Sequence, residues 1–258
     1  MPHTSSVQIA RALLADASRI LVLTGAGISA ESGVPTFRGP GGLWKSHRPE
    51  TLATPEAFGR DPRLVWEWYA WRRALVSRCR PNAAHHALAA LAHARDGVRI
   101  VTQNVDGLHG EAARERAVRD GTASVEPIEL HGSLFRVRCT QCAHEYAHRA
   151  PVDASSPECL PTCARCGALL RPAVVWFGEA LDPTLLDAAW RHARASAVCL
   201  VVGTSGVVQP AASLAEVTRA AGGAVIEINP DETPLTPIAT VSLRGTAVEL
   251  VPAVCPGG

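Results

Sequence analysis

Short apolar segments recur along the chain and alternate with amphipathic ones. The apolar segments predict buried strands in 20–29, where the strand runs into a glycine-rich turn, and at 98–103, 125–130, 173–177, 198–203 and 224–228. The amphipathic segments predict helices at 7–17, 82–94, 184–195 and 211–221. Strands that are apolar along their whole length need cover on both faces, which helices provide in a parallel sheet. The pattern therefore predicts the α/β class, with a doubly wound parallel sheet.

Two segments interrupt this alternation. Residues 34–80 follow the glycine-rich turn and contain the aromatic stretch 66-WEWYAWRR-73, and residues 134–172 are rich in Cys, Pro and polar residues. We expect the two segments to form a small module together. The larger domain is then expected to consist of residues 1–33, 81–133 and 173–258.

The composition is that of an ordinary globular protein. The chain of 258 residues is 47% hydrophobic and 19% charged, with a formal net charge of +1. That balance gives no electrostatic reason to expect nucleic acid or an anionic membrane as a partner. The sequence has no apolar run near the roughly 18 residues that span a bilayer, and its amphipathic N-terminal stretch lacks the apolar region of a signal peptide. We expect a cytoplasmic protein and, as the simplest assembly, a monomer.

The cysteines point to a metal. Four of the eight form two CxxC pairs, Cys139 with Cys142 and Cys163 with Cys166. Tetrahedral zinc takes four thiolates, and two such turns supply two each, so in a cytoplasmic chain this spacing favours a structural zinc ion over disulfides. Cys159 is near enough in sequence to be an alternative ligand. The remaining cysteines are expected to be small buried hydrophobic residues: Cys79, Cys199 and Cys255.

The segment 25-GAGISA-30 has the pattern G-x-G-x-x-A directly after a predicted strand. Glycines in such a turn let the backbone approach a pyrophosphate, although many strand-to-helix turns use glycine for geometry alone. No acidic residue follows a second strand at the distance where dinucleotide-binding dehydrogenases hold the ribose. The pattern therefore disfavours a hydride-transfer dehydrogenase.

Polar residues gather where the predicted strands end. Gln103, Asn104 and Asp106 follow the strand at 98–103, and His131 follows the one at 125–130. Segments 203-GTS-205 and 229-NPD-231 follow two later strands. Because ligands bind at the carboxyl ends of parallel strands, these side chains predict one site, in which an imidazole is suited to general-base catalysis. Taken singly, each segment is equally compatible with a polar turn.

The motifs GAGIS, PTFRG, TQNVDGLH, LHGS, the two CxxC pairs, WFGE, GTS and IN occur in this order over nearly the whole chain. In this arrangement the chain resembles the sirtuins, the NAD-dependent protein-lysine deacylases. The resemblance implies a Rossmann-like large domain and a small domain made of a helical module and a zinc ribbon, with NAD between them. It implies acyl-lysine proteins or peptides as substrates. The implied products are nicotinamide, deacylated lysine and O-acyl-ADP-ribose.

The resemblance also assigns roles to individual residues. His131 matches the catalytic base, which deprotonates a ribose hydroxyl. The positions that match NAD contacts are Gly25, Ala26, Gly27, Thr36, Phe37, Arg38, Trp44, Gln103, Asn104, Val105, Asp106, Gly203, Thr204, Ser205, Asn229, Pro230, Asp231 and Ala247. The positions that match the clamp around a substrate strand are Val175, Phe177, Gly178, Glu179, Gly206 and Val207. Zinc would be structural, because four thiolates leave no open coordination position.

The aromatic stretch bears on which acyl group is removed. Tyr69 and Arg72 are three residues apart and share a helix face. Their spacing is similar to that of a sirtuin subgroup that removes succinyl and malonyl groups, where a Tyr and an Arg bind the acyl carboxylate. Ala53 matches a small residue that widens the acyl pocket in that subgroup. The alternative is that Tyr69 packs in a core and Arg72 points to water. The tryptophans of the stretch are expected mainly to pack: Trp66, Trp68 and Trp71.

Other functions remain compatible with the sequence. The resemblance implies removal of acidic acyl groups together with acetyl groups, but a plain deacetylase or an ADP-ribosyltransferase would use the same NAD site. A zinc-ribbon regulator that only senses NAD or nucleic acid would not need His131 as a base.

Overall fold

The structure is a computed structural model that describes residues 3–35 and 49–255. The α-helices are α1 (His3–Asp16), α2 (Pro49–Leu52), α3 (Pro55–Arg60), α4 (Pro62–Val76), α5 (Ala83–Ala94), α6 (Leu108–Asp120), α7 (Pro183–Ala195), α8 (Ser213–Ala220) and α9 (Ala247–Val254). The strands are β1 (Ile20–Thr24), β2 (Val98–Thr102), β3 (Ile128–Glu129), β4 (Gly132–Cys139), β5 (Glu145–Ala147), β6 (Leu170–Val174), β7 (Val198–Val202), β8 (Ala224–Ile228) and β9 (Val241–Leu243). Short 3-10 helices are η1 (Ala26–Ser32), η2 (Pro157–Cys159) and η3 (Thr236–Ile238).

The larger sheet is parallel throughout and has the strand order β3-β2-β1-β7-β8-β9. The order runs one way from β1 to β3 and the other way from β7 to β9, so it reverses between the neighbouring strands β1 and β7. In open parallel sheets, ligands bind beyond the carboxyl ends of the strands at such a reversal. Every residue of β1 and β7 is buried, as their apolar sequences predict.

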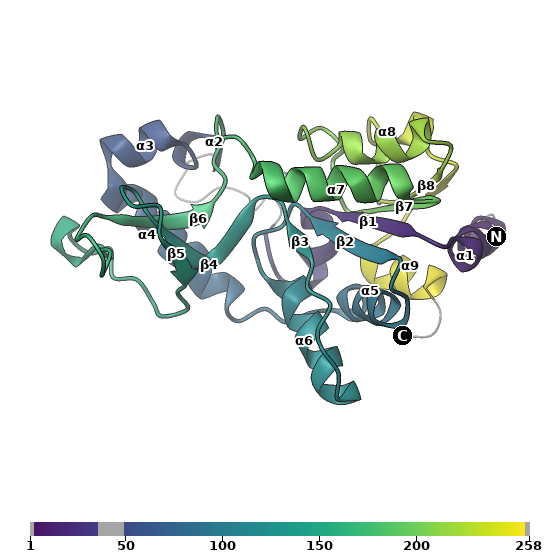
Figure 1. The fold of residues 1–258 in the computed structure, drawn as a ribbon, viewed down its shortest axis with the longest axis horizontal. Coiled ribbons are helices and arrows are strands. Elements are labelled where there is room, and N and C mark those ends of the chain that lie inside the picture. Colours follow the sequence, from purple (N-terminus) through teal and green to yellow (C-terminus); the bar gives the residue numbers. More distant parts are fainter. Residues whose placement is uncertain (1–2, 36–48, 256–258) are drawn as a thin grey trace.

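Helices cover both faces of this sheet, which confirms the predicted Rossmann-like α/β class. Alternate residues of the strands pack in two separate cores: one lies against α1, α5 and α9, and the other against α7 and α8. Figure 1 shows α7 and α8 on one side of the sheet and α5 and α9 on the other. Because the side chains of a strand alternate between its faces, a strand that is apolar throughout supplies both cores at once.

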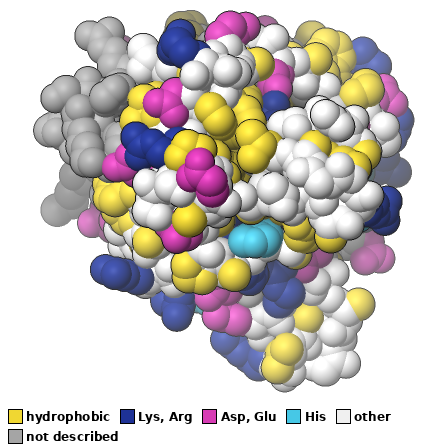
Figure 2. Space-filling model, turned by 90° about the vertical axis from the view of Figure 1, so that its left-hand side faces the viewer, with side chains coloured by type: hydrophobic (Ala, Val, Ile, Leu, Met, Phe, Trp, Pro, Cys, Tyr) yellow, Lys and Arg dark blue, Asp and Glu magenta, His cyan; other side chains and the backbone are white. Residues whose placement is uncertain are grey.

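A second, antiparallel sheet has the order β5-β4-β6 and lies at one end of the molecule with α2, α3 and α4. It has its own hydrophobic core, which includes Trp66, Leu134 and Leu170. The indole N–H of Trp66 donates to the carbonyl of Leu170 at 2.8 Å, so α4 is joined to β6 by a buried hydrogen bond. Figure 2 views this end of the molecule, where hydrophobic side chains lie exposed between basic and acidic ones and neither sign of charge dominates.

The structure corrects several expected elements. The apolar segment at 173–177 was expected as a strand of the parallel sheet, but the strand is Leu170–Val174 and pairs with β4 in the antiparallel sheet. A continuous apolar run shows that a strand is buried, but it does not identify its partner. Of the strand expected at 125–130, only Ile128 and Glu129 pair with β2. Of the three tryptophans expected to pack, Trp66 and Trp68 are buried, whereas Trp71 is 39% exposed.

Two C-terminal elements were not predicted. β9 has only three residues, and α9 contains Pro252, which is unusual inside a helix. Within the described ranges no helix is long and apolar enough to cross a membrane.

Candidate active site

The two strands that flank the reversal end in glycines packed against each other. The amide of Gly27 donates to the carbonyl of Gly203 at 2.8 Å. A Cβ added at Gly27 would lie 2.8 Å from the Cα of Gly203, and one added at Gly25 would lie 2.8 Å from the Cα of Thr204. The G-x-G pattern is therefore required here by backbone packing between two strand ends. This close approach leaves the first turn of η1 at the ligand-binding edge of the sheet.

Polar side chains from three strand ends are joined along this edge. The side-chain amide of Gln103, after β2, donates to the hydroxyl of Thr204 at 2.9 Å. Asn229, after β8, donates from its side-chain amide to the carbonyl of Thr204 at 2.8 Å. Residues that are far apart in the sequence are thus brought together as the strand-end argument predicts. Ala247 begins α9, which packs against η1, and is itself buried.

His131 lies directly beside this row, after β3. Its Nδ1 lies 2.9 Å from the backbone carbonyl of Gln103. A carbonyl oxygen only accepts, so Nδ1 carries the proton and Nε2 is the nitrogen able to take one up. Burial lowers the pKa of His131, against the opposing effect of the bond to Gln103. The ring is therefore neutral near pH 7, which is the state that a general base needs.

Behind these residues lies a buried polar cluster that joins the predicted site residues Asn104 and Asp106 to Ser29 and His85, two residues for which the sequence predicted no role. The hydroxyl of Ser29 donates to the carboxylate of Asp106 at 2.8 Å and accepts from the side-chain amide of Asn104 at 3.1 Å. Nε2 of His85 lies 3.4 Å from the same hydroxyl. Burial raises the pKa of Asp106, while the bonds from Leu108 and Ser29 oppose the rise. Ser29 lies in the glycine-rich segment and His85 in 85-HHA-87, but nothing in the sequence indicates that these two side chains meet.

His109 extends the cluster beneath β1 and β2. Its Nε2 lies 2.9 Å from the hydroxyl of Thr24, which itself donates to Thr102 at 2.9 Å. Nε2 must therefore donate, and Nδ1 is left as a buried acceptor with no partner among the described residues. Burial lowers the pKa of His109 to about 4 and, for the same reason, that of His85 to about 2. Both rings are neutral at physiological pH.

The segment after β6 connects the histidine to the helical module. The amide of Val175 donates to the carbonyl of His131 at 2.9 Å, and the amide of Phe177 donates to the carbonyl of Ala53 at 2.9 Å. Phe177 is 49% exposed and Val207, in the other segment expected to clamp substrate, is 42% exposed. Gly178 and Gly206 both have positive φ, 86° and 68°. Exposed apolar side chains and glycine turns are thus present in both segments.

Arg171 contacts two residues of the segment after β6, Trp176 and Glu179. Its guanidinium lies 3.4 Å from the centre of the Trp176 ring and forms a two-pronged ion pair with Glu179. Glu179 also accepts from the amide of Trp176 at 2.8 Å. Burial opposes ionisation of Glu179, but the bonds from Arg171 and Trp176 hold its pKa below the usual value. Arg171 was not among the predicted site residues, because a lone Arg before a proline gives no signal in the sequence.

Tyr69 is fully buried in the same region. Its phenol oxygen accepts from the indole N–H of Trp176 at 2.8 Å, and burial raises its pKa to about 12. The phenol therefore keeps its proton and remains able to donate it. Its ring packs in the core with Phe58 and Trp176, so the packing part of the alternative interpretation is correct for this residue.

Arg72 does not extend into water as the alternative interpretation proposed. The side chain is half-buried, and its guanidinium carbon lies 4.8 Å from the centre of the Trp68 ring and 5.8 Å from that of Tyr69. Burial lowers the pKa of Arg72, and the electrostatic influence of Tyr69 and Asp106 opposes the change.

The four cysteines of the CxxC pairs converge. Their sulfur atoms all lie within 4.8 Å of one another, with Cys139 and Cys166 3.4 Å apart and Cys142 and Cys163 3.7 Å apart. Four sulfurs at this spacing fit the tetrahedral thiolate set of a structural zinc ion. The amides of Cys142 and Gln141 donate to the sulfur of Cys139 and lower its pKa to about 6, which favours the thiolate.

The other cysteines lie apart from this group. Cys159 is exposed, and its sulfur accepts from the hydroxyl of Ser156 at 3.5 Å; it is not one of the four converging cysteines. Cys79, Cys199 and Cys255 are buried, as predicted. Four expected NAD contacts lie outside the described residues: Thr36, Phe37, Arg38 and Trp44.

Comparison with known proteins gives consistent results. A family profile described as the Sir2 family matches residues 25–210. The NAD-dependent protein deacylase 1 of Archaeoglobus fulgidus is 52% identical over 240 residues, which cover 92% of each chain. The NAD-dependent protein deacylase of Pyrococcus abyssi is 50% identical over 250 residues, which cover 96% of each chain.

Solved structures agree with these relatives. A crystal structure of a Sir2 homologue in complex with NAD has a TM-score of 0.87 and 48% identity, covering 96% of this chain and 92% of that one. A Sir2 variant in complex with a deacetylated p53 peptide and 3′-O-acetyl ADP-ribose has a TM-score of 0.83 and 32% identity, covering 96% of each chain.

Proposed function

Because the chain belongs to the Sir2 family and is an NAD-dependent protein deacylase, we propose that it removes acidic acyl groups, succinyl and malonyl, as well as acetyl from lysine side chains. The observation that carries the acidic preference is the half-buried guanidinium of Arg72, whose carbon lies 5.8 Å from the ring centre of Tyr69, a residue with a neutral phenol.

NAD supplies the ADP-ribosyl group that takes up the acyl group. We assign its pyrophosphate to the glycine turn at 25–27, which follows β1 at the point where the strand order reverses. Its nicotinamide and adjoining ribose are assigned to Gln103–Asp106, and its adenosine end to 203–205, 229–231 and Ala247. NAD would then lie between the parallel sheet and the small module, whose proposed segments are 34–80 and 134–172.

His131 is assigned as the general base. The carbonyl of Gln103 fixes the proton on Nδ1, so Nε2 is available to accept a proton from a ribose hydroxyl. Because the amide of Val175 donates to the carbonyl of His131, the base and one clamp segment are held at a fixed distance. An extended acyl-lysine peptide would lie between the segments 175–179 and 206–207 through backbone hydrogen bonds.

Arg72 and Tyr69 are assigned to the distal end of the acyl group. A carboxylate there would receive a charge-assisted hydrogen bond from the guanidinium and a second from the phenol. An acetyl group has no such carboxylate, so its removal would not depend on Arg72. Ala53, whose carbonyl accepts from the amide of Phe177, is assigned as the small residue beside the acyl chain.

Initial rates on otherwise identical succinyl-, malonyl- and acetyl-lysine peptides with saturating NAD test the proposal. We expect Arg72→Met to lower kcat/KM for the succinyl peptide about 10- to 100-fold, the value of one lost charge-assisted bond. The acetyl peptide should change by less than about threefold. Arg63→Met removes a half-exposed cation from the same helix and serves as the matched control.

Two results would contradict the acidic preference. One is a wild-type enzyme that turns over acetyl peptide as well as, or better than, the succinyl peptide. The other is a parallel loss of both activities in Arg72→Met, which would make Arg72 a structural residue of α4. Neither result would affect the assignment of His131 and NAD.

A further inference from the structure

Glu227 is a carboxylate in an otherwise apolar strand. It lies within 224-AVIEI-228, between buried neighbours, and is itself only 1% exposed. Removing a carboxylate from water carries a large free-energy cost unless hydrogen bonds and an opposite charge offset it. An apolar strand does not need a carboxylate at this position, and Glu227 is not among the residues assigned to the reaction.

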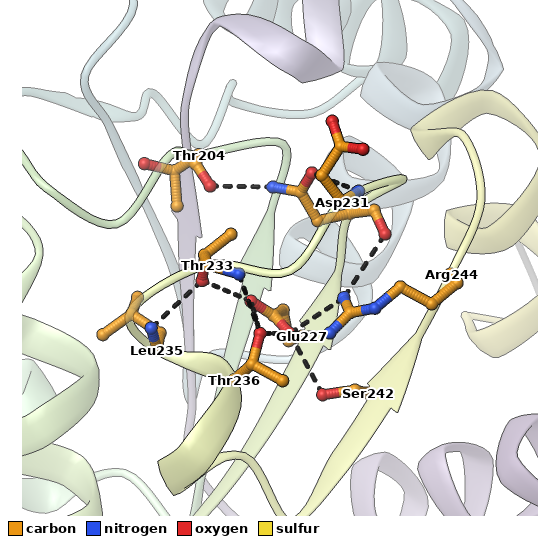
Figure 3. Close-up of polar contacts among 9 residues, drawn as sticks. Thr204, Glu227, Asp231, Thr233, Leu235, Thr236, Ser242 and Arg244 are labelled. Carbon is orange, nitrogen blue, oxygen red and sulfur yellow. Dashed lines mark hydrogen bonds and ion pairs between the residues drawn. The ribbon is translucent and has the colours of Figure 1, made fainter.

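The partners of the carboxylate come from the segment after β8, from β9 and from the residue after β9 (Figure 3). Its oxygens accept from the hydroxyls of Thr233 at 2.5 Å, Thr236 at 2.8 Å and Ser242 at 3.0 Å. Arg244 adds an ion pair at 2.9 Å. Ser242 and Arg244 come from β9 and the residue that follows it, whereas Thr233 and Thr236 belong to the loop after β8.

The hydroxyls of Thr233 and Thr236 also bind backbone amides of the loop. The hydroxyl of Thr236 accepts from the amide of Thr233 at 2.9 Å, and the hydroxyl of Thr233 accepts from the amide of Leu235 at 3.1 Å. Each hydroxyl therefore binds the carboxylate as a donor and the loop as an acceptor. A carboxylate needed only to join β8 to β9 would not require these two residues.

The anchored loop contacts the strand ends assigned to adenosine. Asn229 donates to the carbonyl of Thr204, and its own carbonyl accepts from Arg244 at 3.4 Å. The amide of Asp231 donates to the side chain of Asn229 at 3.2 Å. On the other side, a Cβ at Gly206 would lie 3.1 Å from Leu235, so the loop also packs beneath the start of a clamp segment.

We propose that Glu227 and Arg244 are positioning residues for NAD: they hold the loop from Asn229 to Thr236 so that the residues at 229–231 and 203–205 present a preformed site for the adenosine end. The inference rests on the proposed assignment of those residues to adenosine. Neither Glu227 nor Arg244 is required to touch NAD. Their contribution is to fix the loop before NAD binds, which lowers the ordering cost of binding.

Steady-state kinetics with an acetyl-lysine peptide, together with calorimetric titration of ADP-ribose, test this role. We expect Thr236→Val to raise KM for NAD and Kd for ADP-ribose about tenfold, equivalent to one lost hydrogen-bond contribution of about 1.4 kcal/mol. Glu227→Gln should act in the same direction and at least as strongly. In both variants kcat and KM for the peptide should stay within about twofold, because the reacting end of the site is unchanged.

Thr240→Val is the matched control. The hydroxyl of Thr240 also accepts a backbone hydrogen bond at the β8 edge, from Val225, but it does not contact the carboxylate. We expect its KM for NAD to remain that of the wild type. Thermal unfolding of each variant confirms that the comparison is between folded proteins, and if Glu227→Gln does not fold, Thr233→Val and Thr236→Val carry the test.

The positioning role is overturned if folded Glu227→Gln and Thr236→Val bind ADP-ribose as the wild type does. It is also overturned if their kcat and their KM values for NAD and peptide differ from those of the wild type only as much as the values of Thr240→Val do. Asn229→Ala separates this failure from failure of the adenosine assignment. If Asn229→Ala leaves KM for NAD unchanged, then the assignment of 229–231 is wrong. If it raises KM while Glu227→Gln does not, only the positioning role fails.

Discussion

The indole N–H of Trp176 donates to the phenol oxygen of Tyr69 at 2.8 Å, and both side chains are buried. The bond joins α4 to the segment after β6, which is proposed to clamp the substrate. Trp176 therefore contacts both Tyr69 and the guanidinium of Arg171. Any change at Tyr69 alters both the acyl end of the site and the support of the clamp.

We expect Tyr69→Phe to reduce the free energy of unfolding by about 1–3 kcal/mol, because it leaves the buried indole N–H without an acceptor. Trp176→Phe should also destabilise, and the two changes together should cost less than their sum. A double-mutant cycle by urea unfolding is expected to give a coupling of about 0.5–1.5 kcal/mol. Strict additivity would show that the bond contributes nothing, and would make Tyr69→Phe a clean probe of acyl specificity.

The buried histidines predict a loss of stability in acid. The pKa of His109 is about 4 and that of His85 about 2, both below the ordinary value of 6.5. Above pH 6.5 both rings are neutral in the folded and unfolded chains, so the stability is fully present. As the pH falls below 6.5, only the unfolded chain takes up these protons, and the free energy of unfolding should drop by about 2.7 kcal/mol per pH unit down to about pH 4.

Urea unfolding at a series of pH values measures this slope. His109→Leu should reduce it by about one proton, or about 1.4 kcal/mol per pH unit, since one buried neutral ring is removed. A slope equal to that of the wild type would mean that His109 is not the group responsible.

Protonation of His131 should lower the activity at acidic pH. Because burial lowers the pKa of His131, the base stays neutral below pH 6.5, and kcat/KM for an acetyl peptide should fall only at more acidic pH. His131→Asn keeps a donor for the carbonyl of Gln103 but cannot accept the proton. We expect a loss of about 10²- to 10⁴-fold in turnover with NAD binding retained. Turnover close to that of the wild type in His131→Asn would remove the base assignment.

Removal of zinc should affect folding rather than chemistry. Four thiolates leave no position for a reacting group, so a strong chelator should release about one zinc per chain and broaden the unfolding transition. Cys163→Ser should reproduce the effect without chelator. Cys159→Ser is the matched control, because Cys159 lies outside the converging group, and it should bind zinc normally. An inactive protein that keeps a sharp, unchanged unfolding transition after chelation would indicate a catalytic ion.

Local patterns were enough to predict several parts of the molecule. The apolar strands, the glycine turn at 25–27 and the two CxxC pairs each depend on residues that are near one another in sequence. Their physical consequences are correspondingly local: burial on both faces, backbone close to backbone, and two thiolates per turn. The sheet class and the zinc site were therefore predicted correctly, and the ordered motifs identified the family.

Other features depended on which distant segments meet. Residues 173–177 were assigned to the wrong sheet because an apolar run is compatible with any buried partner. The contact of Tyr69 with Trp176 and the cluster around Ser29 both join residues far apart in the chain. Neither of these has a periodicity or spacing that a sequence can display.

Glu227 is the clearest case of a residue whose role depends on tertiary contacts. From the sequence alone, a single acidic residue in 224-AVIEI-228 marks only an interruption of an apolar strand. The tertiary structure supplies its partners from the loop after β8 and from the end of β9, and these make a buried charge tolerable. The sequence by itself determined which reaction the chain carries out, through motifs whose chemistry is local. Only the tertiary structure decided how the site is held, because hydrogen bonds and ion pairs between distant segments form after the chain has folded.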